Sequence, residues 1–201
     1  MATLSKEERA LCGQVSAEAL EEYVINLTRK VRLSGSPEER ETFRYIARTL
    51  KNWGFEIEEH RCECWTSWPV AALLEILGET PVSVPCITHA MAASTPPEGV
   101  VLDLVDVGRA EPAALAQHPI DGRAALCDGL AMPGKVFRVE QAGAGAQIHV
   151  CGERLHEMIV STIWGSPTPE NASLLPRTPI VSVNGESGAQ LREALGRGPV
   201  R

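Results

Sequence analysis

The sequence predicts a mixed α/β protein, in which a pair of helices precedes a domain of short strands with flanking helices. Two amphipathic patterns of helical period occupy about residues 16–53, and after Gly54 the apolar residues change to alternating or short continuous runs. Hydrophobic residues make up 44% of the 201-residue chain and charged residues 22%, which is sufficient for a buried core. We place the boundary near Trp65–Pro69, which gives segments 1–65 and 66–201.

The first predicted helix follows a polar lead over residues 1–15 and runs from about Ser16 to Arg32. Its apolar residues recur at spacings of three and four and form one stripe, made by Leu20, Val24, Leu27 and Val31. Acidic residues lie near its start and basic residues near its end, as the helix dipole favours.

The second predicted helix has the clearest local signals. Ser36 is a suitable N-cap, Pro37 fits the first helical position and Glu39 completes a capping box. Gly54 stands where a left-handed C-terminal residue is expected. The apolar face consists of Phe43, Ile46, Ala47, Leu50 and Trp53. We expect the two helices to form an antiparallel pair or to flank a larger body.

The remaining elements are shorter. Phe55–Glu58 alternates like a half-buried strand, and Ala71–Leu77 is a short apolar run. Further strands are predicted at Val100–Val107, Arg123–Cys127, Ala146–Cys151 and Ile180–Val183, with helices at Lys135–Ala142 and Glu186–Leu195. An Ala- and Pro-rich loop is expected before Asp121, and another loop at Trp164–Pro179.

Charge and composition exclude several classes of partner. With 19 Lys and Arg against 26 Asp and Glu, the net charge is −7, so a nucleic acid or an anionic membrane surface would meet no basic block. No apolar segment approaches the roughly 20 residues of a membrane helix, and the N-terminus has no apolar signal region. The six cysteines, without an export signal, favour reduced thiols in the cytoplasm.

Four motifs in order resemble two parts of a known family. The run from Asp121 to Gly129, the helix ending at Ala142-Gly143-Ala144 and the Pro-rich segment from Trp164 to Val183 resemble protease-associated domains, whose fold is a short-stranded sandwich or open barrel with flanking helices. Upstream, Arg32–Ser36 and the helix ending at Trp53-Gly54-Phe55 resemble the opening of M28-type metallo-aminopeptidases, which carry such a domain as an insertion.

The resemblance implies a non-catalytic part of a zinc aminopeptidase. The family's zinc ligands and catalytic Glu lie downstream of the inserted domain, so no catalytic residue is carried over to this chain and no cofactor is expected in it. The implied partners are the chain's own C-terminal peptidase domain, a peptide substrate and a second copy of the chain. The implied role is a lid that limits substrate access or mediates assembly.

His60, Cys62 and Cys64 are the candidates for a metal site in this chain. On a strand of period two, all three side chains would project from one face. Zinc in a structural site normally takes four ligands, and this close alternation is not a usual ligand spacing. The alternative is a strand that covers a neighbouring element with small thiols.

Trp65, Trp68 and Trp164 are the candidates for a binding surface, because each is expected in a loop or at a strand end. Packing of these rings in the core is the competing interpretation.

The run Gly185–Gly188 is not a nucleophile elbow, since its second Gly comes one residue early, and a turn that starts a helix is expected there.

Two other functions remain open. A free-standing protease-associated module could bind a peptide or protein without a catalytic half. A small Cys/His metal protein is the third hypothesis, which metal analysis of the purified protein would decide.

Overall fold

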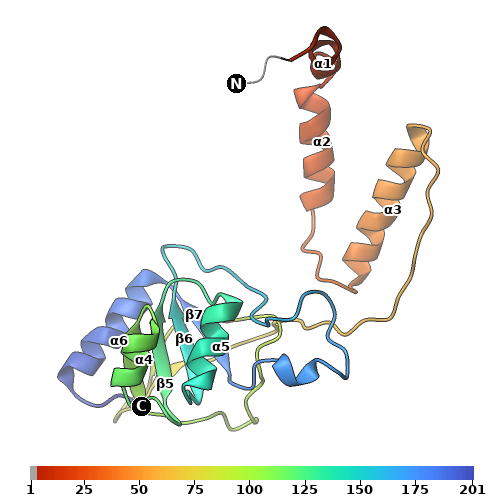
Figure 1. The fold of residues 1–201 in the computed structure, drawn as a ribbon. Coiled ribbons are helices and arrows are strands. Elements are labelled where there is room, and N and C mark those ends of the chain that lie inside the picture. Colours follow the sequence, from red (N-terminus) through yellow and green to blue (C-terminus); the bar gives the residue numbers. More distant parts are fainter. Residues whose placement is uncertain (1–3) are drawn as a thin grey trace. The chain divides into compact units, whose positions relative to one another are not determined.

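The computed structural model describes residues 4–201, and the chain forms two compact units that divide between Cys62 and Glu63. The first unit contains helices, and the second contains a mixed sheet with further helices (Figure 1). Among residues 4–201, no helix has both the length and the apolar character needed to cross a membrane. The predicted mixed α/β class, with helices first and strands after, is confirmed.

The first unit begins with a short helix that the sequence analysis assigned to a polar lead. Helix α1 spans Lys6–Cys12. Its start is a full capping box, because the Glu8 amide donates to Ser5 Oγ at 3.1 Å and the Ser5 amide donates to the Glu8 carboxylate at 2.6 Å. Helix α1 has no buried residue, so no apolar stripe indicated it in the sequence. The sequence signal for this helix is its capping box.

The two predicted amphipathic helices are present as α2, Ala17–Thr28, and α3, Pro37–Asn52. Helix α2 ends before the predicted limit at Arg32, so Val31 of the predicted stripe lies outside it. Ser36 accepts from the Glu39 amide at 3.1 Å as expected, but the Glu39 carboxylate reaches back to the Gly35 amide at 2.7 Å. Gly54 adopts φ +88°. The Gly54 amide donates to the Lys51 carbonyl and the Phe55 amide to the Leu50 carbonyl, which together complete a Schellman motif.

Helices α2 and α3 form an antiparallel pair with few contacts. The rings of Tyr23 and Trp53 meet edge to face at 5.4 Å. Further along, Asn26 Nδ2 donates to the Tyr45 hydroxyl at 3.2 Å, and Lys30 pairs with Glu41 at 2.8 Å. No residue of either helix is buried, so the apolar stripes are not covered within the first unit.

The predicted strand at Phe55–Glu58 is not formed. No residue from 55 to 74 belongs to a strand. The Phe55 amide is used by the cap of α3, and the Phe55 side chain is 59% exposed. Alternation of apolar and charged residues forms a strand only where a partner backbone supplies hydrogen bonds, and this segment has none in the described structure.

The second unit is organised around a five-stranded sheet of order β3-β7-β6-β5-β4. Neighbours from β4 to β7 pair in parallel, and β3 is antiparallel to β7. A separate two-stranded sheet pairs β1, Glu75–Ile76, with β2, Val82–Ser83. The five strands are β3 Ile87–Thr88, β4 Leu104–Gly108, β5 Ala124–Asp128, β6 Ala146–Val150 and β7 Ile180–Val183. The predicted sandwich or open barrel thus takes the form of one sheet and a hairpin with flanking helices.

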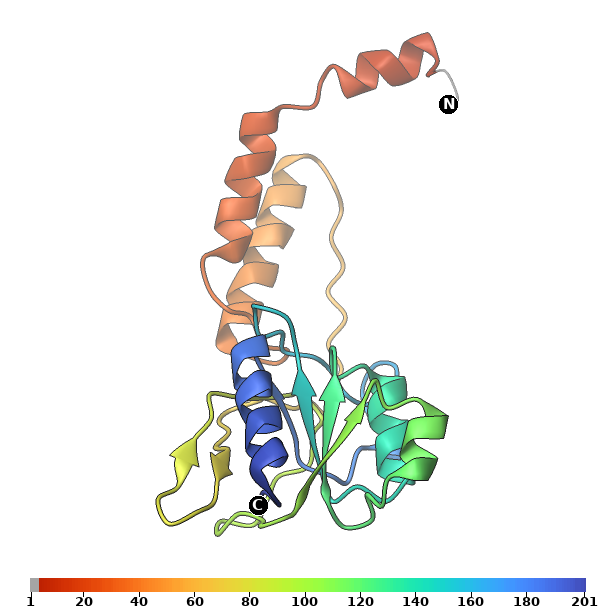
Figure 2. The same ribbon diagram turned by 90° about the vertical axis from the view of Figure 1, so that its left-hand side faces the viewer.

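Helices cover both faces of the sheet (Figure 2). On one face lie α4, Pro112–Gln117, and α5, Pro133–Gln141; on the other lies α6, Gly185–Arg197. Strand β5 supplies both cores, since Leu126 packs with α6 and Cys127 packs with α4 and α5. Because alternate side chains of β5 enter the two cores, both sets are apolar, and the strand is a continuous apolar run up to Cys127.

Several differences from the predicted elements have local causes. Helix α4 lies in the predicted Ala- and Pro-rich loop, because Pro112 fits the first helical turn and the alanines that follow favour a helix. The strand predicted to start at Val100 begins four residues later, as β4, and Val100 itself is 47% exposed. Strands β2 and β3 have two residues each, too few for a period to be recognised.

Candidate functional site

The structure brings two of the three candidate tryptophans into adjacent segments. The Trp65 amide donates to Ser166 Oγ at 2.8 Å, and that hydroxyl donates to the Trp65 carbonyl at 3.2 Å. Trp164 stands two residues before Ser166 and is fully exposed, whereas Trp65 is 57% exposed. The core-packing interpretation therefore does not hold for these two rings. Their part in binding stays a prediction.

Trp68 lies on the same anchored segment. Ser67 Oγ accepts from the Met91 amide at 2.8 Å, which fixes the backbone next to Trp68. The Trp68 side chain is 47% exposed. Residues 65–68 thus form a strap held at two points of the second unit, with both indoles partly in solvent.

The candidate metal ligands are not on a strand. His60, Cys62 and Cys64 lie in the extended segment that follows α3, which corrects the predicted strand geometry. His60 Nε2 lies 3.3 Å from the Glu58 carboxylate, and both cysteines are exposed free thiols. Across residues 4–201, no three His, Cys, Asp or Glu side chains are grouped so that they could hold a metal ion. The described residues therefore do not fit a zinc centre.

A cluster of buried polar side chains, which the sequence analysis missed, lies on the α5 face of the sheet. His89 Nε2 lies 2.9 Å from Ser182 Oγ, and His89 Nδ1 accepts from the Met158 amide at 3.1 Å. Since Nδ1 is an acceptor, the imidazole proton is on Nε2 and points at the serine. His89 is therefore a donor to Ser182 and cannot act as its base in this arrangement.

The second buried histidine, His149, lies one strand further along the sheet. Its Nε2 is 3.2 Å from Gln147 Oε1, and Gln147 Nε2 donates to the Val136 carbonyl and to Thr178 Oγ1. Burial lowers the pKa of His149 to about 3 and that of His89 to about 4. Both imidazoles are neutral at pH 7. The only sequence signal for this buried cluster is the presence of polar residues, Gln147 and His149, inside the otherwise apolar strand β6, Ala146–Val150.

Charged side chains at the carboxyl end of the sheet are paired with one another. Arg192 of α6 lies 2.6 Å from Asp106, within β4, and 2.6 Å from Asp128, the last residue of β5. These hydrogen bonds raise the pKa of Arg192, with that from Asp106 the largest cause. Strands β4 to β7 follow one another in one direction, so this edge lacks the reversal of strand order at which open α/β sheets bind ligands.

The run Gly185–Gly188 begins helix α6, as predicted. Asn184 is the N-cap and accepts from the Ser187 amide at 2.8 Å. Ser187 is 4% exposed, so its hydroxyl does not face a substrate-accessible surface. This arrangement is a helix start and carries no nucleophile.

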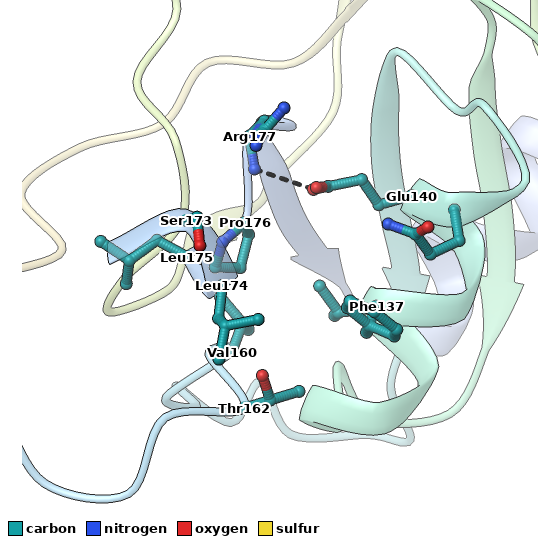
Figure 3. A pocket seen from close by; sticks show the side chains of 11 residues that line it. Phe137, Glu140, Val160, Thr162, Ser173, Leu174, Leu175, Pro176 and Arg177 are labelled. Atoms are coloured by element: carbon teal, nitrogen blue, oxygen red, sulfur yellow. Dashed lines mark hydrogen bonds between the residues drawn. The ribbon is translucent and has the colours of Figure 1, made fainter. Parts of the chain in front are cut away.

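One cavity of about 110 Å³ lies between α5 and the segment 173–177 (Figure 3). Its apolar lining comes from Val136, Phe137, Val160, Leu174, Leu175 and Pro176. Glu140 also lines it, and its carboxylate accepts from the Arg177 amide at 2.8 Å. The cavity thus combines an apolar wall with one acidic residue, Glu140, and one basic residue, Arg177.

Comparisons with known proteins give a fold relationship. No protein-family model matches the chain, and no curated protein matches it. Among solved structures, an aminopeptidase from Aneurinibacillus sp. strain AM-1 is similar over 94% of this chain, with 23% identity and a TM-score of 0.65. A peptidase M28 precursor from Shewanella amazonensis is similar over 96%, with 16% identity and a TM-score of 0.59. A zinc aminopeptidase from Bacillus subtilis is similar over 92%, with 18% identity and a TM-score of 0.54.

The match covers only part of each of these proteins. The chain spans 43%, 47% and 42% of the lengths of these three chains, respectively. At such identities the relationship is one of fold. The chain shares the fold of the corresponding part of these proteins, and the match extends over both units of the chain.

Proposed function

We propose that the chain is a non-catalytic part of a zinc-dependent aminopeptidase of the M28 type. The observation that carries the proposal is the match over 94% of this chain to less than half of an aminopeptidase. Residues 1–65 are the start of the peptidase domain, and residues 66–201 are the inserted protease-associated domain. Zinc is held by residues outside the 201, and the working compartment is the cytoplasm.

The uncovered helix pair supports this proposal. Leu20, Val24 and Phe43 are each more than half exposed, although they belong to the apolar faces of α2 and α3. Helices of this length depend on packing of an apolar face for most of their stability. The partner for this face is the peptidase domain of the same polypeptide, and the fold relationship supports that assignment.

The second unit acts as a lid that limits access of peptide substrates. Trp65, Trp68 and Trp164 supply large exposed contact surfaces on two adjoining segments. Aromatic side chains of this kind give contact area at low conformational cost. In the complete enzyme they contact the part of a peptide that extends beyond the residue to be removed.

The test of the parent activity uses the 201-residue chain and the same chain continued through the coding sequence after Arg201. We expect the longer protein to hydrolyse amino-acyl anilides with zinc and to lose that activity with a chelator. The 201-residue chain should be inactive. Chelator-sensitive hydrolysis by the 201-residue chain, or a natural stop codon after Arg201, would overturn the proposal.

The lid role is tested separately in the longer protein. Trp164→Ala should change the ratio of kcat/KM for long over short peptides at least threefold, because Trp164 is fully exposed and its loss leaves the fold intact. Val101→Ala, at a position 63% exposed on another segment of the same unit, is the matched control. Equal ratios in both variants would contradict the lid.

A free-standing binding module is the second candidate, and the exposed tryptophans favour it equally. In that case the 201-residue chain itself binds peptides, and Trp164→Ala weakens binding with no catalytic domain present. Fluorescence titration of the 201-residue chain with a peptide library separates this outcome from the lid.

A further inference from the structure

We propose that the cavity between α5 and segment 173–177 binds a primary ammonium group carried on a short branched aliphatic chain. The proposal does not rest on the aminopeptidase assignment, because it concerns a site formed wholly within the second unit. Figure 3 shows Phe137 and Glu140 of α5 facing Leu174, Leu175 and Pro176 across the cavity.

The apolar lining determines the shape of the ligand's tail. Val136 and Val160 are 1% and 0% exposed, while Phe137 and Leu174 remain 43% and 49% exposed. A ligand tail would therefore cover apolar surface that now faces water, which is favourable. The volume of about 110 Å³ is smaller than the roughly 150 Å³ apolar cavity known to take up benzene, so a tail of roughly four or five carbons fits.

Glu140 determines the charge of the ligand. The Arg177 amide, the Thr178 amide and Thr178 Oγ1 all donate to its Oε2, at 2.8, 3.3 and 3.3 Å. These bonds fix the carboxylate in place but bring no positive charge. A carboxylate offers about four lone-pair positions, so acceptor capacity remains for a further donor.

No cationic side chain neutralises this carboxylate. Within residues 4–201, no side-chain nitrogen of Lys, Arg or His lies within 4 Å of the Glu140 carboxylate, and this holds for Arg177 although it also lines the cavity. By contrast, Asp106 and Asp128 both pair with Arg192. An ammonium group is the donor that supplies both a hydrogen bond and the missing charge. An apolar wall beside it then selects an alkyl ammonium over a hydrated inorganic cation.

The experiment titrates the 201-residue chain with 3-methylbutylamine and follows the backbone amide signals of Phe137 and Leu174 by NMR. We expect saturable shifts at these two positions. The anion 4-methylpentanoate, which has the same branched tail, should give none. Glu140→Gln keeps an acceptor for the Arg177 and Thr178 donors but removes the charge, so the affinity should fall about tenfold or more.

A second variant and a control protect the test against a folding effect. Ser173 lines the cavity from an exposed position, so Ser173→Phe should block it without disturbing the core. Glu193→Gln, on α6 and paired with Arg197, removes one negative charge elsewhere and should bind like the wild type. Unchanged affinity in both cavity variants, equal binding of the anion, or absence of saturable shifts would overturn the proposal.

Discussion

Gly188 of α6 lies so close to Val150 of β6 that a Cβ at Gly188 would come within 2.4 Å of Val150 Cγ1. The same Cβ would lie 2.8 Å from Val150 Cγ2 and 3.2 Å from its Cβ. Because Val150 is a β-branched residue within the sheet, it has little freedom to move away. The helix therefore approaches the sheet at a distance that only glycine permits.

Gly188→Ala should destabilise the second unit by about 1–3 kcal/mol, since the added methyl group forces α6 away from β6. The measurement is the midpoint of urea unfolding. Gly196→Ala in the same helix is the matched control, because a Cβ at Gly196 meets nothing within 4 Å. That change should stabilise by up to about 1 kcal/mol through helix propensity. Equal midpoints for the two variants would show that the close packing is not rigid.

The elements that could be predicted are those whose signals are local. Ser36 and Pro37 define the start of α3, and the Schellman residue Gly54 defines its end, so the helix is readable from a few neighbouring residues. The strand β7 was predicted with its observed limits, Ile180–Val183, because its short apolar run is bounded by Pro179 and Asn184.

Features that depend on distant partners could not be predicted. Phe55–Glu58 has the pattern of a strand but no partner backbone, and the pairing of His89 with Ser182 joins residues 93 apart. The cavity beside Glu140 likewise forms only when the segment before β7 packs against α5. Periodicity states which side of an element is apolar, but it does not state what covers that side.

Arg192 joins α6 to two neighbouring strands through Asp106 and Asp128, so Arg192→Ala should lower stability by about 1–2 kcal/mol. The pair is partly exposed, with side-chain exposures of 36% for Arg192 and 32% for Asp106, so solvent screening limits the effect. The loss also leaves Asp106 and Asp128 without their shared cation. Arg197→Ala, whose side chain is 72% exposed, should change the unfolding midpoint little.

Adding Asp106→Asn to Arg192→Ala distinguishes charge from packing. If repulsion between unpaired aspartates contributes, the double variant should recover part of the lost stability. No loss in the single variant, measured by urea unfolding at low salt, would show that the two 2.6 Å contacts contribute nothing in solution.

Acid should destabilise the second unit as the pH falls below about 6.5. His89 and His149 have folded-state pKa values of about 4 and about 3, lowered by burial, with Lys135 and His89 lowering that of His149 further. The unfolded chain takes up protons at these residues near pH 6.5, while the folded chain stays neutral. Stability is thus fully present above pH 6.5 and is lost as the pH falls toward the folded pKa values.

Between pH 7 and pH 5, the two histidines together should reduce the free energy of unfolding by on the order of 4 kcal/mol. Urea unfolding at half-unit pH intervals measures the slope. His149→Gln should reduce the slope at pH 5 by about one proton, because glutamine does not titrate. A slope that is the same in this variant as in the wild type would mean that His149 is not protected from protonation in the folded state.

The uncovered helix pair makes a final prediction about association. In the 201-residue chain, Leu20 and Val24 on the apolar stripe of α2 are 53% and 57% exposed, and Val31, which lies beyond the end of α2, is 80% exposed. Contiguous exposed apolar surface of this kind promotes association in water. We expect the mass from light scattering to rise with concentration, as copies cover one another's stripes. The double variant Leu20→Ser, Val24→Ser should remain monomeric over the same range.

Glu21→Gln with Glu22→Gln is the matched control, since it alters the same helix at exposed positions outside the stripe. It should associate at least as strongly as the wild type, because the changes remove charge repulsion and leave the apolar stripe intact. A strictly monomeric wild type at high concentration would contradict the expectation and would indicate that the stripe is covered within the chain. If the proposed peptidase domain covers this surface, a chain continued into that domain should not associate in this way.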